Sequence, residues 1–210
     1  FPMTKIVLLE SSISRNGLLS ALPELAPPSK QGPVAKTKSL GPDVIDAAIN
    51  RLAETISHQH QSTRNLILLG IANGGIELSR RLAAKLMVKN LGILDISFHR
   101  DDIGQSPIPK EFTPTQIAVD VSGATVILVD DVLYSGRTVK AALAELFDHG
   151  RPAKVELAVL VDRGGRVLPL AADYTGLTLS PKIGEKIIVS LDAAHAARDL
   201  IRIETSGRKS

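Results

Sequence analysis

The sequence contains no cysteine and no tryptophan, and aromatic side chains make up only 3% of its 210 residues. The absence of cysteine excludes disulfides, thiolate metal ligands and a thiol nucleophile. Because aromatic side chains are scarce, the stacking platforms that many single-stranded nucleic-acid binders use are scarce too. With 44% hydrophobic residues the chain can still bury a substantial core, which must be aliphatic.

Charge of one sign and long apolar runs are also lacking. The net charge is +3, from 25 basic and 22 acidic residues, an excess too small to indicate nucleic-acid binding by itself. No apolar run approaches the roughly 18 residues of a membrane-spanning helix, and no signal-peptide pattern opens the chain. We therefore expect a cytoplasmic protein with no membrane partner, in which Phe1 and Pro2 are a cloning remnant ahead of Met3.

The chain is expected to consist of an extension, one α/β domain and a short tail. Residues 1–39 are rich in Ser, Pro, Gly and Lys, so apart from a short strand at Lys5–Glu10 we expect an extension that is partly flexible or wraps the core surface. Residues 40–204 carry apolar runs and helical patterns that are typical of a mainly parallel, twisted sheet flanked by helices. Residues 205–210 form a polar and basic tail to which we assign no role.

Apolar patterns give the expected elements of this domain. They predict strands at 66–69, 93–99, 126–129, 155–161, 186–191 and 200–203. They also predict helices at 43–56 and 76–88, and a third helix from the region of Thr138 to about His149.

The stretch Thr125–Val139, TVILVDDVLYSGRTV, is the centre of the domain. Its apolar run Val126–Val129 shows no alternation, which is typical of a strand buried on both faces of a parallel sheet. The run ends in Asp130 and Asp131, which we expect to lie exposed at the strand tip, where ligands of open α/β sheets bind. Carboxylates only accept hydrogen bonds, so they suit the vicinal hydroxyls of a ribose, directly or through a divalent cation.

The loop after the two acids has the composition of a phosphate site. Ser135, Gly136 and Thr138 bring hydroxyl and backbone N–H groups to the positive end of a helix dipole. A ligand whose sugar binds the two acids and whose phosphate binds this loop would be a ribose 5-phosphate. The alternative is a solvated strand end without a ligand.

This stretch resembles the phosphoribosyl pyrophosphate (PRPP) signature of the type I phosphoribosyltransferases. In detail it is similar to that of the pyrimidine operon attenuation regulators that double as uracil phosphoribosyltransferases. Four further segments agree in order: LGI at 69–71, DISFHRDDI at 95–103, GRPAKVELAVLVDRG at 150–164 and ADY at 172–174. The resemblance implies the type I fold with a flexible hood, PRPP and a pyrimidine base, uracil above all, as substrates, Mg²⁺ held mostly by substrate and water, and a homo-oligomer.

The resemblance also implies the residues of the site. Asp130 and Asp131 are expected to hold the ribose and, indirectly, its metal, with Asp131 also acting in acid-base catalysis. The whole PRPP site is expected to comprise Asp130, Asp131, Val132, Leu133, Tyr134, Ser135, Gly136, Arg137 and Thr138. The strand-to-helix turn Ala72, Asn73, Gly74 and Gly75 is the expected pyrophosphate loop, often with a cis peptide in the family; an ordinary Gly-rich turn is the alternative.

Two further loops are expected near the substrate. Arg100 and Asp102 belong to the implied hood, and an ordinary solvated loop is the alternative for each. Asp162 and Arg163 follow the strand 155–161 and are expected to approach the base and pyrophosphate. For Arg163 a salt bridge to a nearby carboxylate is an equal alternative.

Several positions depart from the family pattern. Relatives usually carry Thr-Arg-Gly in place of Asn73-Gly74-Gly75, so a guanidinium aimed at pyrophosphate is missing. The residues Glu54, Gly165, Ala171 and Leu177 stand where relatives carry polar or cationic groups associated with RNA contact. Three hypotheses remain: a PRPP-dependent uracil phosphoribosyltransferase, an RNA-binding attenuator, which these four departures disfavour, and a PRPP or nucleotide sensor that has lost its chemistry, suggested by Gly74.

Overall fold

A computed structural model describes residues 38–97 and 114–205, all within the compact unit Ala35–Ser210. The predicted strand at Lys5–Glu10, the implied hood residues Arg100 and Asp102, and the tail after Thr205 lie outside the described residues.

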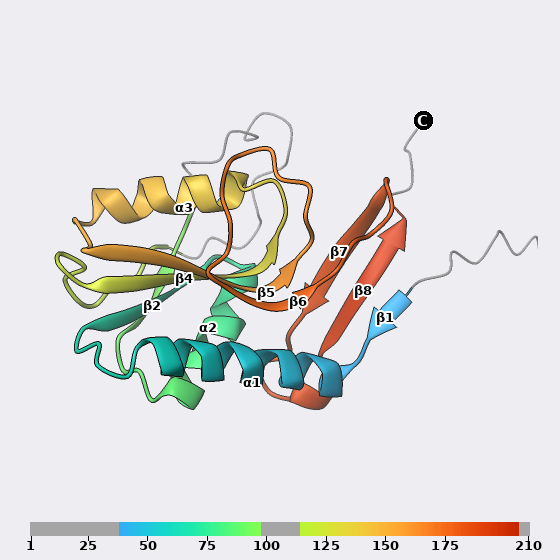
Figure 1. Cartoon of the computed structure of the whole chain (residues 1–210), viewed down its shortest axis with the longest axis horizontal. Helices are drawn as coiled ribbons and strands as arrows, with labels where there is room; N and C mark the ends of the chain where they lie inside the picture. Colours follow the sequence, from blue (N-terminus) through green and yellow to red (C-terminus); the bar gives the residue numbers. More distant parts are fainter. Residues whose placement is uncertain (1–37, 98–113, 206–210) are drawn as a thin grey trace, which may run out of the picture. The chain divides into compact units, whose positions relative to one another are not determined.

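A five-stranded parallel sheet with the order β3-β2-β4-β5-β6 forms the centre of this unit (Figure 1). Every neighbouring pair of its strands is parallel, as the sequence predicts. The strands are β2 (Leu66–Ile71), β3 (Leu91–Leu94), β4 (Thr125–Leu133), β5 (Lys154–Asp162) and β6 (Tyr174–Thr178).

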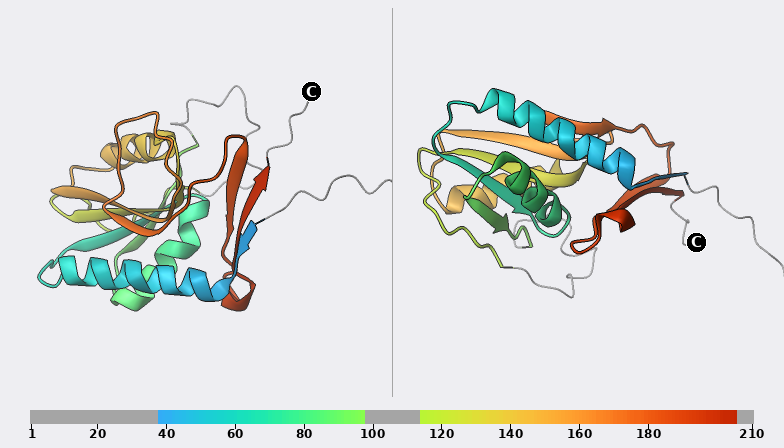
Figure 2. Two further views of the ribbon diagram at one scale, coloured as in Figure 1. Left: turned by 45° about the vertical axis from the view of Figure 1, so that its right-hand side comes forward. Right: turned by 90° about the horizontal axis from the view of Figure 1, so that it is seen from below.

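Helices cover both faces of the sheet. The helices α1 (Pro42–Gln59) and α2 (Gly74–Leu86) lie on one face, and α3 (Arg137–Asp148) lies on the other, as Figure 2 also shows. Residues of β4 alternate between the two cores: Ile127 and Val129 pack with α1 and α2, whereas Val126 and Leu128 pack with α3. All four are at most 1% exposed, which confirms the predicted strand buried on both faces.

A second, smaller sheet is antiparallel, with the order β1-β8-β7. Its strands are β1 (Lys38–Leu40), β7 (Glu185–Ser190) and β8 (Leu200–Thr205), and a short 3-10 helix, η1 (Ala196–Arg198), precedes β8. The strand β1 was not predicted, because three residues carry no periodic signal and their conformation comes from pairing with β8. In the described part of the chain no helix is both long and apolar enough to span a membrane.

Several predicted boundaries were wrong, those of β3, α2 and β4 among them. The strand β3 ends at Leu94, although the apolar pattern continues toward His99. The helix α2 begins at Gly74 and ends before Met87, whose φ of 55° is left-handed. The strand β4 does not end at the two acids but continues to Leu133, because its last residues pair with β5.

Candidate active site

The two acids lie within β4, and the last residues of that strand, Val132 and Leu133, separate them from the turn that leads into α3. Asp130 is only 5% exposed and its Oδ1 accepts the backbone N–H of Asp131 at 3.0 Å. Asp131 is half-buried. The expectation of two exposed strand-tip carboxylates was therefore wrong, because β4 runs on past them and the start of α2 packs against the strand.

Burial changes the acid strength of both groups. Burial, together with the neighbouring charge of Asp131, raises the pKa of Asp130 well above its ordinary value. Burial likewise raises the pKa of Asp131, although backbone hydrogen bonds partly oppose the change. Two adjacent buried carboxylates repel each other when both are ionised, so the pair favours a proton or a cation beside it.

The turn between β4 and α3 has the geometry of an anion site. Gly136 caps α3 with φ of 89°, a left-handed conformation that side chains rarely adopt. The Oγ of Ser135 accepts the N–H of Arg137 at 3.3 Å. Thr138 is exposed in the first turn of the helix. The predicted phosphate loop thus opens at the positive end of a 12-residue helix.

The turn after β2 lies directly beside the acids. A Cβ atom added at Gly74 would stand 2.5 Å from Cγ of Asp131, so the carboxylate occupies the space that a side chain at position 74 would need. A Cβ atom at Gly75 would overlap the carbonyl oxygen of Val129. The peptide bond between Ala72 and Asn73 is cis, as the resemblance implied. The structure therefore brings the predicted pyrophosphate loop into contact with the predicted ribose site.

Arg163 has partners other than those expected. Its guanidinium lies 3.8 Å from the centre of the Tyr134 ring and Nη2 donates to the backbone carbonyl of Glu185 at 3.0 Å. Among the described residues no carboxylate pairs with it. Arg163 thus joins the phosphate loop to β7, in a cation–π contact that sequence patterns cannot reveal.

Sequence reasoning missed Arg166. This side chain donates to the carbonyls of Leu133 and Tyr134 at 3.2 and 3.0 Å and pairs with Asp162 at 2.7 Å. The Oδ1 of Asp162 accepts the N–H of Gly164 at 2.8 Å, so the predicted ligand Asp162 is engaged within its own loop. No sequence signal separates Arg166 from an ordinary surface arginine, because three of its four acceptors are backbone carbonyls, which have no residue-type signature.

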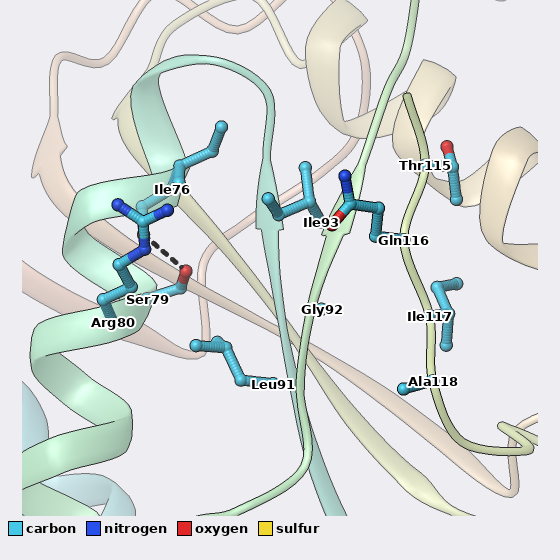
Figure 3. A pocket seen from close by; sticks show the side chains of 10 residues that line it. All are labelled: Ile76, Ser79, Arg80, Leu91, Gly92, Ile93, Thr115, Gln116, Ile117 and Ala118. Carbon is cyan, nitrogen blue, oxygen red and sulfur yellow. Dashed lines mark hydrogen bonds between the residues drawn. The ribbon is translucent and has the colours of Figure 1, made fainter. Parts of the chain in front are cut away.

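A separate cavity of about 530 Å³ lies at the β3 edge of the sheet (Figure 3). It holds none of the predicted site residues and no carboxylate. We assign the chemistry to the acids and loops instead, because there two carboxylates, a helix N-terminus and a Gly-rich turn lie together. Its lining residues are Ile76, Ser79, Arg80, Leu91, Gly92, Ile93, Thr115, Gln116, Ile117 and Ala118.

Comparison with known proteins agrees with this geometry. The family model of the phosphoribosyl transferase domain matches residues 43–193. The chain belongs to the phosphoribosyltransferase family. The bifunctional protein PyrR of Roseiflexus sp. (strain RS-1) is 44% identical over 166 residues, which cover 76% of this chain and 90% of that protein. The PyrR protein of Deinococcus deserti is 45% identical over 164 residues, which cover 74% of this chain and 88% of that protein.

Solved phosphoribosyltransferases share the fold. Hypoxanthine phosphoribosyltransferase of Trypanosoma cruzi aligns with a TM-score of 0.60 and 20% identity over 82% of this chain and 93% of that one. A hypoxanthine-guanine phosphoribosyltransferase of Bacillus anthracis aligns with a TM-score of 0.58 and 19% identity over 81% of this chain and 98% of that one. The predicted type I phosphoribosyltransferase fold is confirmed.

The surface of α1 that the resemblance associates with RNA contact has two notable features. Nη1 of Arg51 donates to the backbone carbonyl of Gly176 in β6 at 2.9 Å. Glu54 is exposed one turn further along the helix. The arginine is thus engaged within the fold and the neighbouring charge is negative, which is unfavourable for an approaching phosphate.

Proposed function

We propose that this phosphoribosyltransferase transfers the 5-phosphoribosyl group of PRPP to uracil, giving UMP and pyrophosphate. The contact between the Asp131 carboxylate and Gly74 carries the proposal. Because Asp131 also lies just ahead of the phosphate loop in β4, a single ligand can meet the acids, the phosphate loop and the pyrophosphate turn at once. PRPP has a group for each of these three places.

The reaction needs positioning and charge stabilisation rather than a covalent nucleophile. A uracil ring nitrogen forms a bond to the anomeric carbon while the carbon–oxygen bond to pyrophosphate breaks, and the bonding electrons leave with pyrophosphate. Backbone N–H groups of the two turns stabilise the phosphate charges. Asp131 takes up the proton that the ring nitrogen loses, and its raised pKa suits this task.

The two acids also suit Mg²⁺ as a cofactor. Asp130 and Asp131 are the acidic donors at this point, and no group of three or more metal-ligating side chains occurs among residues 38–97 and 114–205. A set of two carboxylates fits an ion that takes most of its ligands from substrate oxygens and water. When bound, the ion would offset the negative charge that pyrophosphate carries as it leaves.

Uracil is proposed as the acceptor because relatives that cover most of the chain are PyrR proteins and the central motif resembles that of uracil-using members. Turnover of PRPP with uracil, orotate, hypoxanthine, guanine and xanthine in the presence of Mg²⁺ tests this choice. We expect UMP formation to exceed the other products by at least about tenfold in kcat/KM. Preferential use of a purine would refute uracil as the acceptor but leave phosphoribosyl transfer intact.

An RNA-binding attenuator is the second candidate, supported by the description of the PyrR relatives as bifunctional. The engaged Arg51 and the exposed Glu54 speak against it. A gel-shift with a pyrimidine-operon leader RNA at physiological salt tests this second candidate. We expect no sequence-selective shift, and tight selective retention would establish this second function. A sensor without chemistry is the third candidate, and any steady-state formation of UMP would eliminate it.

A further inference from the structure

The turn 133–136 presents its carbonyl groups to the segment after β5. The carbonyl oxygen of Leu133 accepts the N–H of Arg163 at 3.0 Å. The carbonyl oxygen of Ser135 accepts the N–H groups of Val167 and Leu168, also at 3.0 Å. The segment 163–168 therefore lies behind the turn and binds its backbone acceptors.

This arrangement determines where the donors of the turn point. In a planar trans peptide unit, the C=O of one residue and the N–H of the next point in opposite directions. When the carbonyls of residues 133–135 face the segment behind them, the N–H groups of residues 134–136 face away from it. That is the side on which a phosphate at the start of α3 would bind.

Arg166 binds two of these carbonyls with its side chain. Nη1 donates to the carbonyls of Leu133 and Tyr134 at 3.2 and 3.0 Å. Nε donates to the carbonyl of Leu170 at 3.0 Å, and Nη2 donates to Oδ2 of Asp162 at 2.7 Å. The carboxylate of Asp162 thus fixes the orientation of the planar guanidinium through Nη2, and Nη1 binds the carbonyls of the turn.

We infer that Arg166 is a positioning residue for the phosphate loop, which acts through the carbonyls of Leu133 and Tyr134 to keep the N–H groups of the turn aimed at the 5-phosphate. The inference rests on the proposed function, because it concerns the same PRPP site. Arg166 acts from behind the turn, so the geometry of its fork matters and its charge alone does not suffice.

Two substitutions separate the effect of the guanidinium geometry of Arg166 from the effect of its positive charge. R166K keeps the positive charge, but a single ammonium nitrogen cannot replace three guanidinium nitrogens that bind four acceptors. R166Q removes the charge as well. R151Q is the matched control, because Arg151 also donates to backbone carbonyls, those of Phe147 and Gly150, at the far end of α3. Calorimetric titration of the full chain with ribose 5-phosphate measures the effect.

We expect R166K and R166Q each to weaken ribose 5-phosphate binding about tenfold or more while remaining folded at the temperature of the titration, and R151Q to bind as the wild type does. In turnover the KM for PRPP should rise by more than kcat falls. Wild-type affinity in R166K would overturn the inference and leave the proposed function standing. A wild-type protein that does not bind ribose 5-phosphate would overturn both.

Hydrogen exchange in the wild-type protein tests the same coupling without any variant. Ribose 5-phosphate should slow amide exchange in the segment 163–168 as well as in residues 134–136, because the ligand stabilises the turn and the turn holds the segment. Slowing confined to residues 134–136 would overturn the inference.

Discussion

At the scale of single residues, the candidate active site has a glycine, Gly74, where a side chain would meet Asp131. Gly74 leaves room for the carboxylate of Asp131, which a Cβ atom at that position would approach to 2.5 Å. The missing arginine at this position is therefore more than a lost cation. In this chain an acidic group occupies the space beside the turn Ala72–Gly75, so a positive charge there would have to come from a bound metal ion.

We predict that G74A lowers kcat/KM for PRPP by about tenfold or more, because Asp131 must move away from its position. Folding should be retained, since the group that must shift is the end of a side chain. Steady-state kinetics and thermal unfolding check both points. G41A is the control: a Cβ atom at Gly41 meets nothing within 4 Å, so wild-type kinetics are expected. Equal kinetics in G74A and G41A would contradict the prediction.

Replacing the two acids by Asn should lower activity, and replacing Asp130 should at the same time raise stability. We expect D130N or D131N to lower turnover by roughly a hundredfold or more, since each removes a charge that the transition state needs. The folded-state pKa of Asp130 is raised, so the folded protein binds an extra proton and loses stability as pH rises above the ordinary value of 3.8.

D130N has no such group, so it should melt above the wild type at neutral pH, and the difference should vanish as pH falls toward 3.8. Thermal melts across this pH range, without ligand or metal, make the measurement. A D130N protein that melts below the wild type at neutral pH would show that the carboxylate stabilises the fold.

At the scale of elements, α1 is tied to β5 and β6 by a buried polar cluster. Glu156 Oε2 lies 2.7 Å from Nε2 of His60 and accepts the hydroxyl of Tyr174 at 3.1 Å, and Lys154 pairs with Oε1 at 2.5 Å. Burial alone would raise the pKa of Glu156, but these partners outweigh it and lower the pKa. The cluster lies near the start of β5, at the end of that strand remote from the candidate active site.

We predict that E156Q destabilises the protein at neutral pH by roughly 1.5 to 3 kcal/mol, the usual cost of losing hydrogen bonds to a buried charged group. Because the folded-state pKa is lowered, this stabilisation is present above the ordinary value of 4.5 and is lost as pH falls below it. The difference in the free energy of unfolding between the wild type and E156Q, measured with urea, should therefore decrease as the pH is lowered. E54Q, at an exposed site in α1, is the control. A difference between the wild type and E156Q that increases at low pH would contradict the prediction.

At the scale of the whole molecule, one arginine links α2 to the segment that leads into β8. Arg81 donates to Asp199 through both of its terminal nitrogens, to Glu77 at 2.9 Å and to the carbonyl of Asp192 at 2.8 Å. Asp199 is only 3% exposed. These contacts attach the segment before β8, and with it the small antiparallel sheet, to helix α2, which packs against the parallel sheet.

We predict that R81M destabilises the protein by about 3 kcal/mol, because it leaves the buried Asp199 carboxylate without its cation. R80M is the control, since the side chain of Arg80 is 56% exposed and only approaches Glu77 at 3.6 Å. Urea unfolding measures the free energy, and hydrogen exchange should show that β8 opens first in R81M. Equal stability of the two variants would rule out this role for Arg81.

Much of the fold could be predicted because its signals are local. Four uninterrupted apolar residues before Asp130 indicate a strand covered on both sides, and the helices α1 and α3 carry regular apolar spacing. The strands β1 and β6 were not predicted as such, since each is short and forms through pairing with a neighbour. The length of β4 was wrong for the same reason: pairing with β5 extends it beyond the apolar run.

The sequence by itself determined the fold class, the order of most elements and the stretch proposed to carry the site, because apolar periodicity and a turn rich in small and hydroxyl residues are local features of the chain. Only the tertiary structure decided that Asp130 is buried, that Asp131 lies against Gly74 and that Arg166 donates to the carbonyls of the turn after β4. These features arise between segments far apart in sequence and depend on backbone carbonyls and on space, neither of which has a residue-type signature.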